Sequence, residues 1–150
     1  MFDMPSPTGA WSLRRLASEA GVLPKVARDA AAEGVIDQMV IVESDILLVR
    51  LYGALKRHVW PEERRPANKD QGLRLWEQIA IDTVRGATPE ELGPATGLFI
   101  HQTGARLANG PGEYCTELFR LQDEPFYYAP IGKWFRELPS QRHYSERAAN

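Results

Sequence analysis

Side chains that could bind a metal or act as nucleophiles are few and widely separated in this chain. The three histidines, His58, His101 and His143, show no metal-ligand spacing, and Cys115 is the single cysteine. No histidine lies near Cys115 in sequence, and we expect this residue to be a small buried side chain in a strand. The sequence also lacks a phosphate-binding loop, a nucleophile elbow and a His-Glu-x-x-His motif. We therefore expect a protein that is not an enzyme and holds no cofactor or metal.

Basic side chains near the start of the chain offer a different chemistry. Arginine and lysine donate hydrogen bonds to phosphate oxygens and to the guanine edge in the major groove of DNA. In residues 11–36 these side chains are Arg14, Arg15, Lys25 and Arg28. What they can contact depends on the elements that carry them.

Two short helices joined by a tight turn are predicted for residues 12–34. Ser12 can cap the first helix, and Gly21 breaks it. A second helix covers residues 24–33 and ends at Gly34, as helices often end at glycine. The apolar positions recur at helical spacing and are Leu13, Leu16, Ala17 and Ala20 in the first helix and Val26, Ala27 and Ala30 in the second.

The segment WSLRRLASEAGVLPKVARDAAAEGVI, residues 11–36, resembles the helix-turn-helix DNA-binding motif of the MerR family. That pattern has an aromatic residue, a small polar cap, an apolar residue, Leu-Ala, Ala-Gly-Val, an arginine, and Glu-Gly before two apolar residues. The matching residues follow without a gap: Trp11, Ser12, Leu13, Leu16, Ala17, Ala20, Gly21, Val22, Arg28, Glu33, Gly34, Val35 and Ile36. The resemblance covers about the first third of the chain.

The resemblance implies that the helix over residues 24–33 inserts into the major groove. Lys25 and Arg28 would then lie on its outer face, where they could contact phosphates or guanines. Arg14 and Arg15, near the start of the first helix, could touch backbone phosphates. The expected role of the segment is sequence-specific binding of double-stranded DNA.

Residues 35–42, rich in β-branched side chains, predict two very short strands that form a minimal wing. The segment ESDILLVRLYGAL, residues 43–55, resembles the acidic start of the family's next helix, which we expect to extend to about Val59. Aromatic residues usual after the family's arginine are absent, and so are the cysteine ligands of its metal-sensing branch. Pro61 and Pro66 interrupt the region of its long dimerisation helix. The resemblance therefore implies a winged helix and not a metal or drug sensor.

The second half of the chain carries a weaker pattern of the same kind. An amphipathic helix is predicted for residues 71–85, followed by a helix, a turn at Gly97 and a further helix that ends at Asn109 and Gly110. On this interpretation His101, Gln102 and Arg106 face outward and could contact DNA. The alternative is an α+β dimerisation or ligand-binding domain.

The remaining segments complete the predicted organisation. Residues 113–131 read as two strands joined at residues 122–125, and a short helix follows over residues 132–138. Aromatic side chains in this region could stack on bases or form the core under the hairpin; they are Phe126, Tyr127, Tyr128, Trp134 and Phe135. The predicted domains are a flexible leader 1–10, a winged helix 11–60, a linker 61–70, a second winged-helix-like domain 71–138 and a flexible tail 139–150.

Composition and charge limit the function without selecting it. Hydrophobic residues make up 43% and charged residues 25% of the 150 residues, which is typical of a folded globular protein. The net charge is −2, and residues 11–65 carry nine basic and eight acidic side chains, so charge gives DNA binding no support. No apolar run approaches the ~18 residues of a membrane helix, no signal peptide is recognisable, and one cysteine cannot form an internal disulfide.

The sequence therefore predicts a mostly α protein with small β wings that binds double-stranded DNA. Its expected role is that of a transcriptional regulator, or of a phage- or plasmid-type repressor or excision factor. The expected location is the cytoplasm, in association with the nucleoid, for a protein of bacterial or phage origin. No membrane partner is expected. A protein-interaction adaptor or antirepressor built on winged helices is the alternative, with a second regulatory protein or a homodimer as partner.

Overall fold

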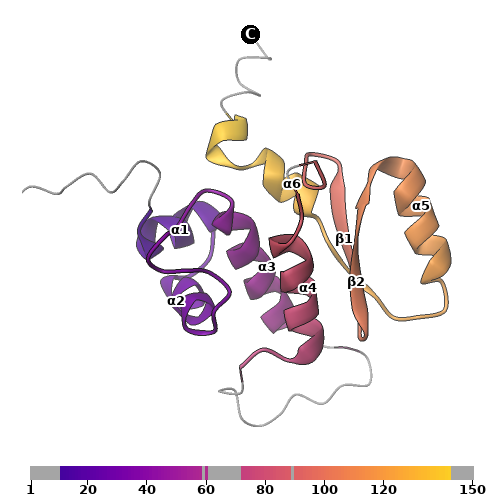
Figure 1. Cartoon of the computed structure of the whole chain (residues 1–150), viewed down its shortest axis with the longest axis horizontal. Helices are drawn as coiled ribbons and strands as arrows, with labels where there is room; N and C mark the ends of the chain where they lie inside the picture. The colour runs from indigo at the N-terminus through magenta and orange to yellow at the C-terminus, as the bar shows by residue number, and fades with distance from the viewer. Residues whose placement is uncertain (1–10, 59, 61–71, 89, 143–150) are drawn as a thin grey trace, which may run out of the picture. The chain divides into compact units, whose positions relative to one another are not determined.

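The computed structural model describes residues 11–58, 60, 72–88 and 90–142 (Figure 1). The chain divides into two compact units. Residues 1–53 and 137–150 form one, called here the N-terminal unit, and residues 54–136 form the other, called the sheet unit. The predicted leader 1–10 and linker 61–70 lie outside the described residues, as does Val59.

The N-terminal unit begins with the predicted pair of helices, α1 (Leu13–Ala20) and α2 (Pro24–Ala32). The hydroxyl of Ser12 caps α1 by accepting a hydrogen bond from the backbone N–H of Arg15 at 3.1 Å. Gly21 adopts the left-handed conformation, with φ of 69°, that turns the chain between the helices. These local features confirm the cap, the turn and the two helices.

The predicted wing over residues 35–42 is wrong, because these residues form turns and no strand. The carboxylate of Asp37 accepts a hydrogen bond from the N–H of Met39 at 2.9 Å, and the backbone carbonyl of Asp37 accepts one from the N–H of Val40 at 3.1 Å. Aspartate thus closes a local turn in place of a ladder between strands. The next helix, α3 (Asp45–Arg57), follows as predicted, and its last four residues belong to the sheet unit.

The start of the predicted flexible tail is ordered in the N-terminal unit. Residues 139–142 are helical, and the backbone N–H of Ser140 donates to the Glu43 carboxylate at 3.0 Å. Arg142 pairs with Glu19 at 2.9 Å. Residues 139–142 therefore form a hydrogen-bonded helical turn, and the rest of the predicted tail lies outside the described residues.

The sheet unit is a three-stranded antiparallel sheet with helices on both faces. Its elements are α4 (Leu75–Arg85), β1 (Thr96–His101), β2 (Gly104–Asn109), α5 (Gly110–Arg120), β3 (Tyr127–Ala129) and α6 (Ile131–Arg136). The strand order is β2-β1-β3, and α4 and α5 lie on opposite faces of the sheet (Figure 1). The central strand β1 is consequently buried on both sides along its first five residues.

The second helix-turn-helix predicted over residues 88–109 is wrong, because β1 and β2 form a hairpin there. The run from Leu98 to Ile100 is apolar at every position, as suits a strand covered on both faces. Gly97 is not a turn residue but lies inside β1, where a Cβ would come within 2.5 Å of the Tyr128 ring. The order of elements in this unit is therefore not that of a winged helix, although the alternative of an α+β domain agrees with it.

A strand predicted at the start of residues 113–131 is also wrong, since helix α5 occupies it. Gly110, with φ of 83°, redirects the chain after β2, and Pro111 stands in the first turn of the helix. The carboxylate of Glu113 accepts a hydrogen bond from the N–H of Asn109 at 3.2 Å and so stabilises the helix start. Cys115 is exposed on this helix and is not the buried strand residue expected. The second predicted strand and the short helix correspond to β3 and α6.

Aromatic side chains fill both halves of the core of the sheet unit. Phe99 packs with Tyr114 and Phe126 on one side. A second group contains His58, Trp60, Trp76 and Tyr127, with ring centroids between 4.5 and 5.8 Å apart in the contacting pairs. Burial of Trp134 as well supports a core role for much of the aromatic set. None of the helices in the described part of the chain has the length and apolar character needed to cross a bilayer.

Candidate nucleic-acid interface

Helix α2 is held by small side chains on its inner side. Ala27 and Ala30 are fully buried, as are Leu16 and Ala17 of α1. Such small residues let two helices approach closely, which is the packing that a helix-turn-helix needs. The N–H of Val22 donates to the carbonyl of Ala17 at 3.0 Å and closes the turn between the helices.

Helix α3 supports α2 from another direction. At Gly53 of α3, a Cβ would lie 3.5 Å from the Val26 side chain and 3.8 Å from Val22. The backbone of α3 at Gly53 therefore lies close to both valine side chains. Two helices, α1 and α3, thus fix the orientation of α2, and they leave its opposite side free of apolar packing.

The outer side of α2 carries the two predicted contact residues. Lys25 and Arg28 are both exposed, together with Ala32 one turn further on. The Lys25 ammonium lies 3.2 Å from the Asp29 carboxylate, and the lysine side chain is 75% exposed. Among the described residues the Arg28 guanidinium has no ion-pair partner. A helix with one free and one weakly paired cation on its exposed side is suited to contact an anionic surface.

The first helix adds two more exposed cations, Arg14 and Arg15. The Arg15 guanidinium stacks on the Trp11 ring, with 3.9 Å between its carbon and the ring centroid. This cation–π contact restricts the arginine without consuming its hydrogen-bond donors. All four predicted basic residues of the N-terminal unit are therefore exposed, on the two helices that the motif uses.

The N-terminal unit also has exposed apolar side chains, which the sequence interpretation did not single out. Leu23, which precedes α2, is 73% exposed, and Met39 and Val40 in the turn segment are 85% and 60% exposed. Val42 is 41% exposed. Met39, Val40 and Val42 lie in the region predicted to be a wing, where an alternating strand would have buried about half of the side chains.

The other three predicted contact residues lie in the sheet unit. His101 and Gln102 stand at the turn of the β1–β2 hairpin, and Arg106 lies on β2. The His101 ring hydrogen-bonds with the Thr103 hydroxyl at 3.1 Å, and Arg106 pairs with Glu117 at 3.9 Å. None of the three is on a helix, so the argument that placed them on a recognition helix no longer applies.

Comparison with known proteins adds no relative: no protein-family model, curated protein or solved structure matches the chain. Within the described residues there is also no group of three or more His, Cys, Asp or Glu side chains that could hold a metal. The functional interpretation therefore depends on the chain's own residues.

Proposed function

We propose that the N-terminal unit binds double-stranded DNA by inserting α2 into the major groove. The observation that supports this proposal is the geometry of α2: its alanine side is fully buried, and Lys25 and Arg28 project from the opposite side. The B-DNA major groove, about 12 Å wide, admits one α-helix. Arg28 is the residue for a guanine edge, since its guanidinium can make a bidentate contact.

The start of α2 supports the same orientation. No acidic side chain lies in its first turn, and the preceding residue, Leu23, has no side-chain oxygen to cap the helix. The positive end of the helix dipole thus stays available to a phosphate. Arg14 and Arg15 on α1 then contact the backbone beside the groove. The turn segment 35–42 carries no basic side chain, so it contributes little phosphate affinity in place of a wing.

The proposed role is that of a sequence-specific regulator, repressor or excision factor. Because the net charge is only −2, we expect contacts with base edges to determine which DNA sequence the protein binds. The three exposed cations assigned to phosphates, Arg14, Arg15 and Lys25, predict a slope of roughly −3 for log affinity against log salt. Fluorescence anisotropy with labelled duplexes over a salt series tests this value. A flat salt dependence, or no binding at the lowest salt, would exclude the proposal.

A protein-interaction adaptor is the second candidate, and the exposed side chains of Leu23, Met39 and Val40 favour it. Neighbouring exposed apolar residues often mark a protein interface. The two functions respond differently to mutation of the turn segment. A Met39→Ser/Val40→Ser variant would retain full DNA affinity if DNA is the partner, because neither side chain can neutralise a phosphate. An adaptor would show no DNA affinity in either form.

A further inference from the structure

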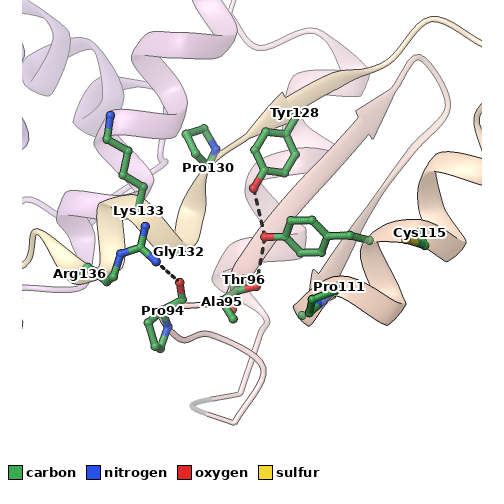
Figure 2. Close-up of a pocket in the computed structure, with 12 residues that line it drawn as sticks. Pro94, Ala95, Thr96, Pro111, Cys115, Tyr128, Pro130, Gly132, Lys133 and Arg136 are labelled. Atoms are coloured by element: carbon green, nitrogen blue, oxygen red, sulfur yellow. Dashed lines mark hydrogen bonds between the residues drawn. The ribbon is translucent and has the colours of Figure 1, made fainter.

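The sheet unit contains a pocket of about 570 Å³ that the DNA-binding proposal does not use. It lies between the loop that leads into β1, the start of α5, and the β3–α6 segment (Figure 2). Its size falls in the range of about 300–1,000 Å³ that is typical of small-molecule sites. Residues far apart in the sequence thus form a concave surface, which explains why the sequence did not reveal it.

Two tyrosines form the aromatic wall of the pocket, and Gly97 makes room for them. A Cβ at Gly97 would come within 2.6 Å of the Tyr114 hydroxyl and 2.5 Å of the Tyr128 ring. The Tyr114 hydroxyl donates to the carbonyl of Ala95 at 3.1 Å. It has a single proton, so the 3.0 Å bond between the two hydroxyls is donated by Tyr128. The wall is therefore fixed by its own hydrogen bonds.

The same hydrogen bonds define what the tyrosines can offer a ligand. Burial and the bond to Tyr128 raise the pKa of Tyr114 to about 12, so its phenol stays protonated at neutral pH. Both hydroxyl protons are already donated inside the wall, so neither phenol has a proton left to donate to a ligand. Flat aromatic rings favour an apolar or aromatic ligand body.

Close packing of α6 makes the opposite wall rigid. A Cβ at Gly132 would lie 2.5 Å from the Pro94 carbonyl oxygen, so only glycine fits there. The Arg136 guanidinium donates to the same carbonyl at 2.8 Å (Figure 2). This bond uses one of five N–H donors and leaves the others available to a ligand.

The charge of the pocket is positive. Among its lining residues the charged side chains are Lys133, at the rim, and Arg136, and no aspartate or glutamate is present. Within the described part of the chain Lys133 has no ion-pair partner. Gly110 and Pro111 at the start of α5 also line the pocket, so the positive end of that helix dipole adds to the field.

We propose that this pocket binds a small molecule in which a carboxylate is joined to a planar apolar body. The carboxylate lies against the free donors of Arg136, with Lys133 as the second cation. The body lies against the rings of Tyr114 and Tyr128. A neutral ligand would leave the cations without a partner, and an inorganic anion would leave the aromatic wall uncovered.

Amide NMR spectra of the full chain, titrated without DNA, test this proposal with naphthoate as the probe. Naphthamide is the neutral control and inorganic phosphate the control without an apolar body. We expect naphthoate to shift the amide resonances of Gly110, Cys115 and Gly132, with both controls at least about tenfold weaker, as loss of a charge-assisted hydrogen bond implies. Equal affinity for naphthamide or phosphate would overturn the proposal. So would the absence of shifts at these residues at millimolar naphthoate.

Variants locate the contact. Arg136→Gln should weaken naphthoate binding at least about tenfold, and Arg136→Lys should recover part of the affinity. If Arg136→Gln does not fold, Lys133→Gln decides, because that side chain is exposed and free of ion pairs within the described residues; it should weaken naphthoate and leave naphthamide unchanged. Arg85→Gln, an exposed cation of the same unit outside the pocket, is the matched control. Equal affinity in wild type and the Lys133 and Arg136 variants would refute the assigned contact.

Discussion

Replacing the two outer cations of α2 by alanine tests the proposed contact with DNA. The change is Lys25→Ala/Arg28→Ala. A bidentate arginine–guanine contact is worth about 1–3 kcal/mol, and a lysine–phosphate hydrogen bond about 1.5–3 kcal/mol. The two lower limits together correspond to roughly 60-fold in affinity for the specific duplex. The salt dependence should also become shallower, by about one unit of slope for each lost phosphate contact.

The fold should tolerate this change, because both side chains are exposed. The structural interaction lost is the Lys25–Asp29 pair on one helix, worth about 0.3–0.5 kcal/mol. Alanine returns a few tenths of a kcal/mol in helix propensity. The melting temperature should therefore move by less than about 2 °C. The loss in the DNA-binding constant should therefore exceed the change in the folding equilibrium constant by more than about tenfold.

Fluorescence anisotropy at fixed ionic strength, with circular dichroism for folding, measures both quantities. The matched control is Arg85→Ala/Arg106→Ala, which removes the same charge from exposed positions of the sheet unit. It should leave specific affinity within about twofold of wild type, the size expected for long-range charge effects at physiological salt. Wild-type affinity in a folded Lys25→Ala/Arg28→Ala variant would refute the assignment of α2 as the recognition helix, and an equal loss in the control would reduce the effect to net charge.

Three further predictions concern the supports of the two units, each measured by thermal and denaturant unfolding. Gly21→Val should destabilise by about 1–2 kcal/mol, because φ of 69° is costly for a β-branched residue; an unchanged melting temperature would contradict the turn. Gly97→Ala should cost about 1–3 kcal/mol by overpacking against the tyrosine wall, and wild-type stability there would contradict that geometry. Burial and the Arg74 charge lower the pKa of His58 below 6.5, so stability should fall from about pH 7 to pH 5 as the unfolded chain gains the proton first. His58→Gln should flatten that profile, and an equally steep profile would place its origin elsewhere.

The N-terminal helices were predictable because their signals are local. A serine cap and a helix-breaking glycine each act within a few residues, and both were confirmed at Ser12 and Gly21. The helical spacing of the apolar residues in the two short helices then placed Lys25 and Arg28 on the exposed side. The part of the site formed by α1 and α2 could accordingly be predicted from the sequence.

The wing failed because β-branched composition and turn chemistry competed in one short segment. Val35, Ile36 and Ile41 are buried, but Val35 and Ile36 are adjacent, whereas a strand with one exposed face buries alternate residues. The Asp37 side chain instead accepts a hydrogen bond from the N–H of Met39. The prediction gave more weight to the β-branched composition than to Asp37. In the structure the turn at Asp37 determines the conformation of the segment.

The sheet unit failed for a longer-range reason. Strand β1 is covered on both faces, so its apolar run has no alternation and resembles a buried helix. Gly97 was taken for a turn, whereas it is small because Tyr114 and Tyr128 pack over it from later elements. Contacts of that kind, and the pocket that they help to form, are not encoded at any fixed spacing along the chain.

Selection of binding sites from a random DNA library with the purified protein tests whether α2 reads a DNA sequence. We expect enrichment of a short motif that contains a guanine contacted by Arg28, with affinity that falls steeply as salt rises. The same selection with Lys25→Ala/Arg28→Ala should enrich nothing. Failure of the wild-type protein to enrich any sequence at low salt, or enrichment of the same motif by both proteins, would contradict it.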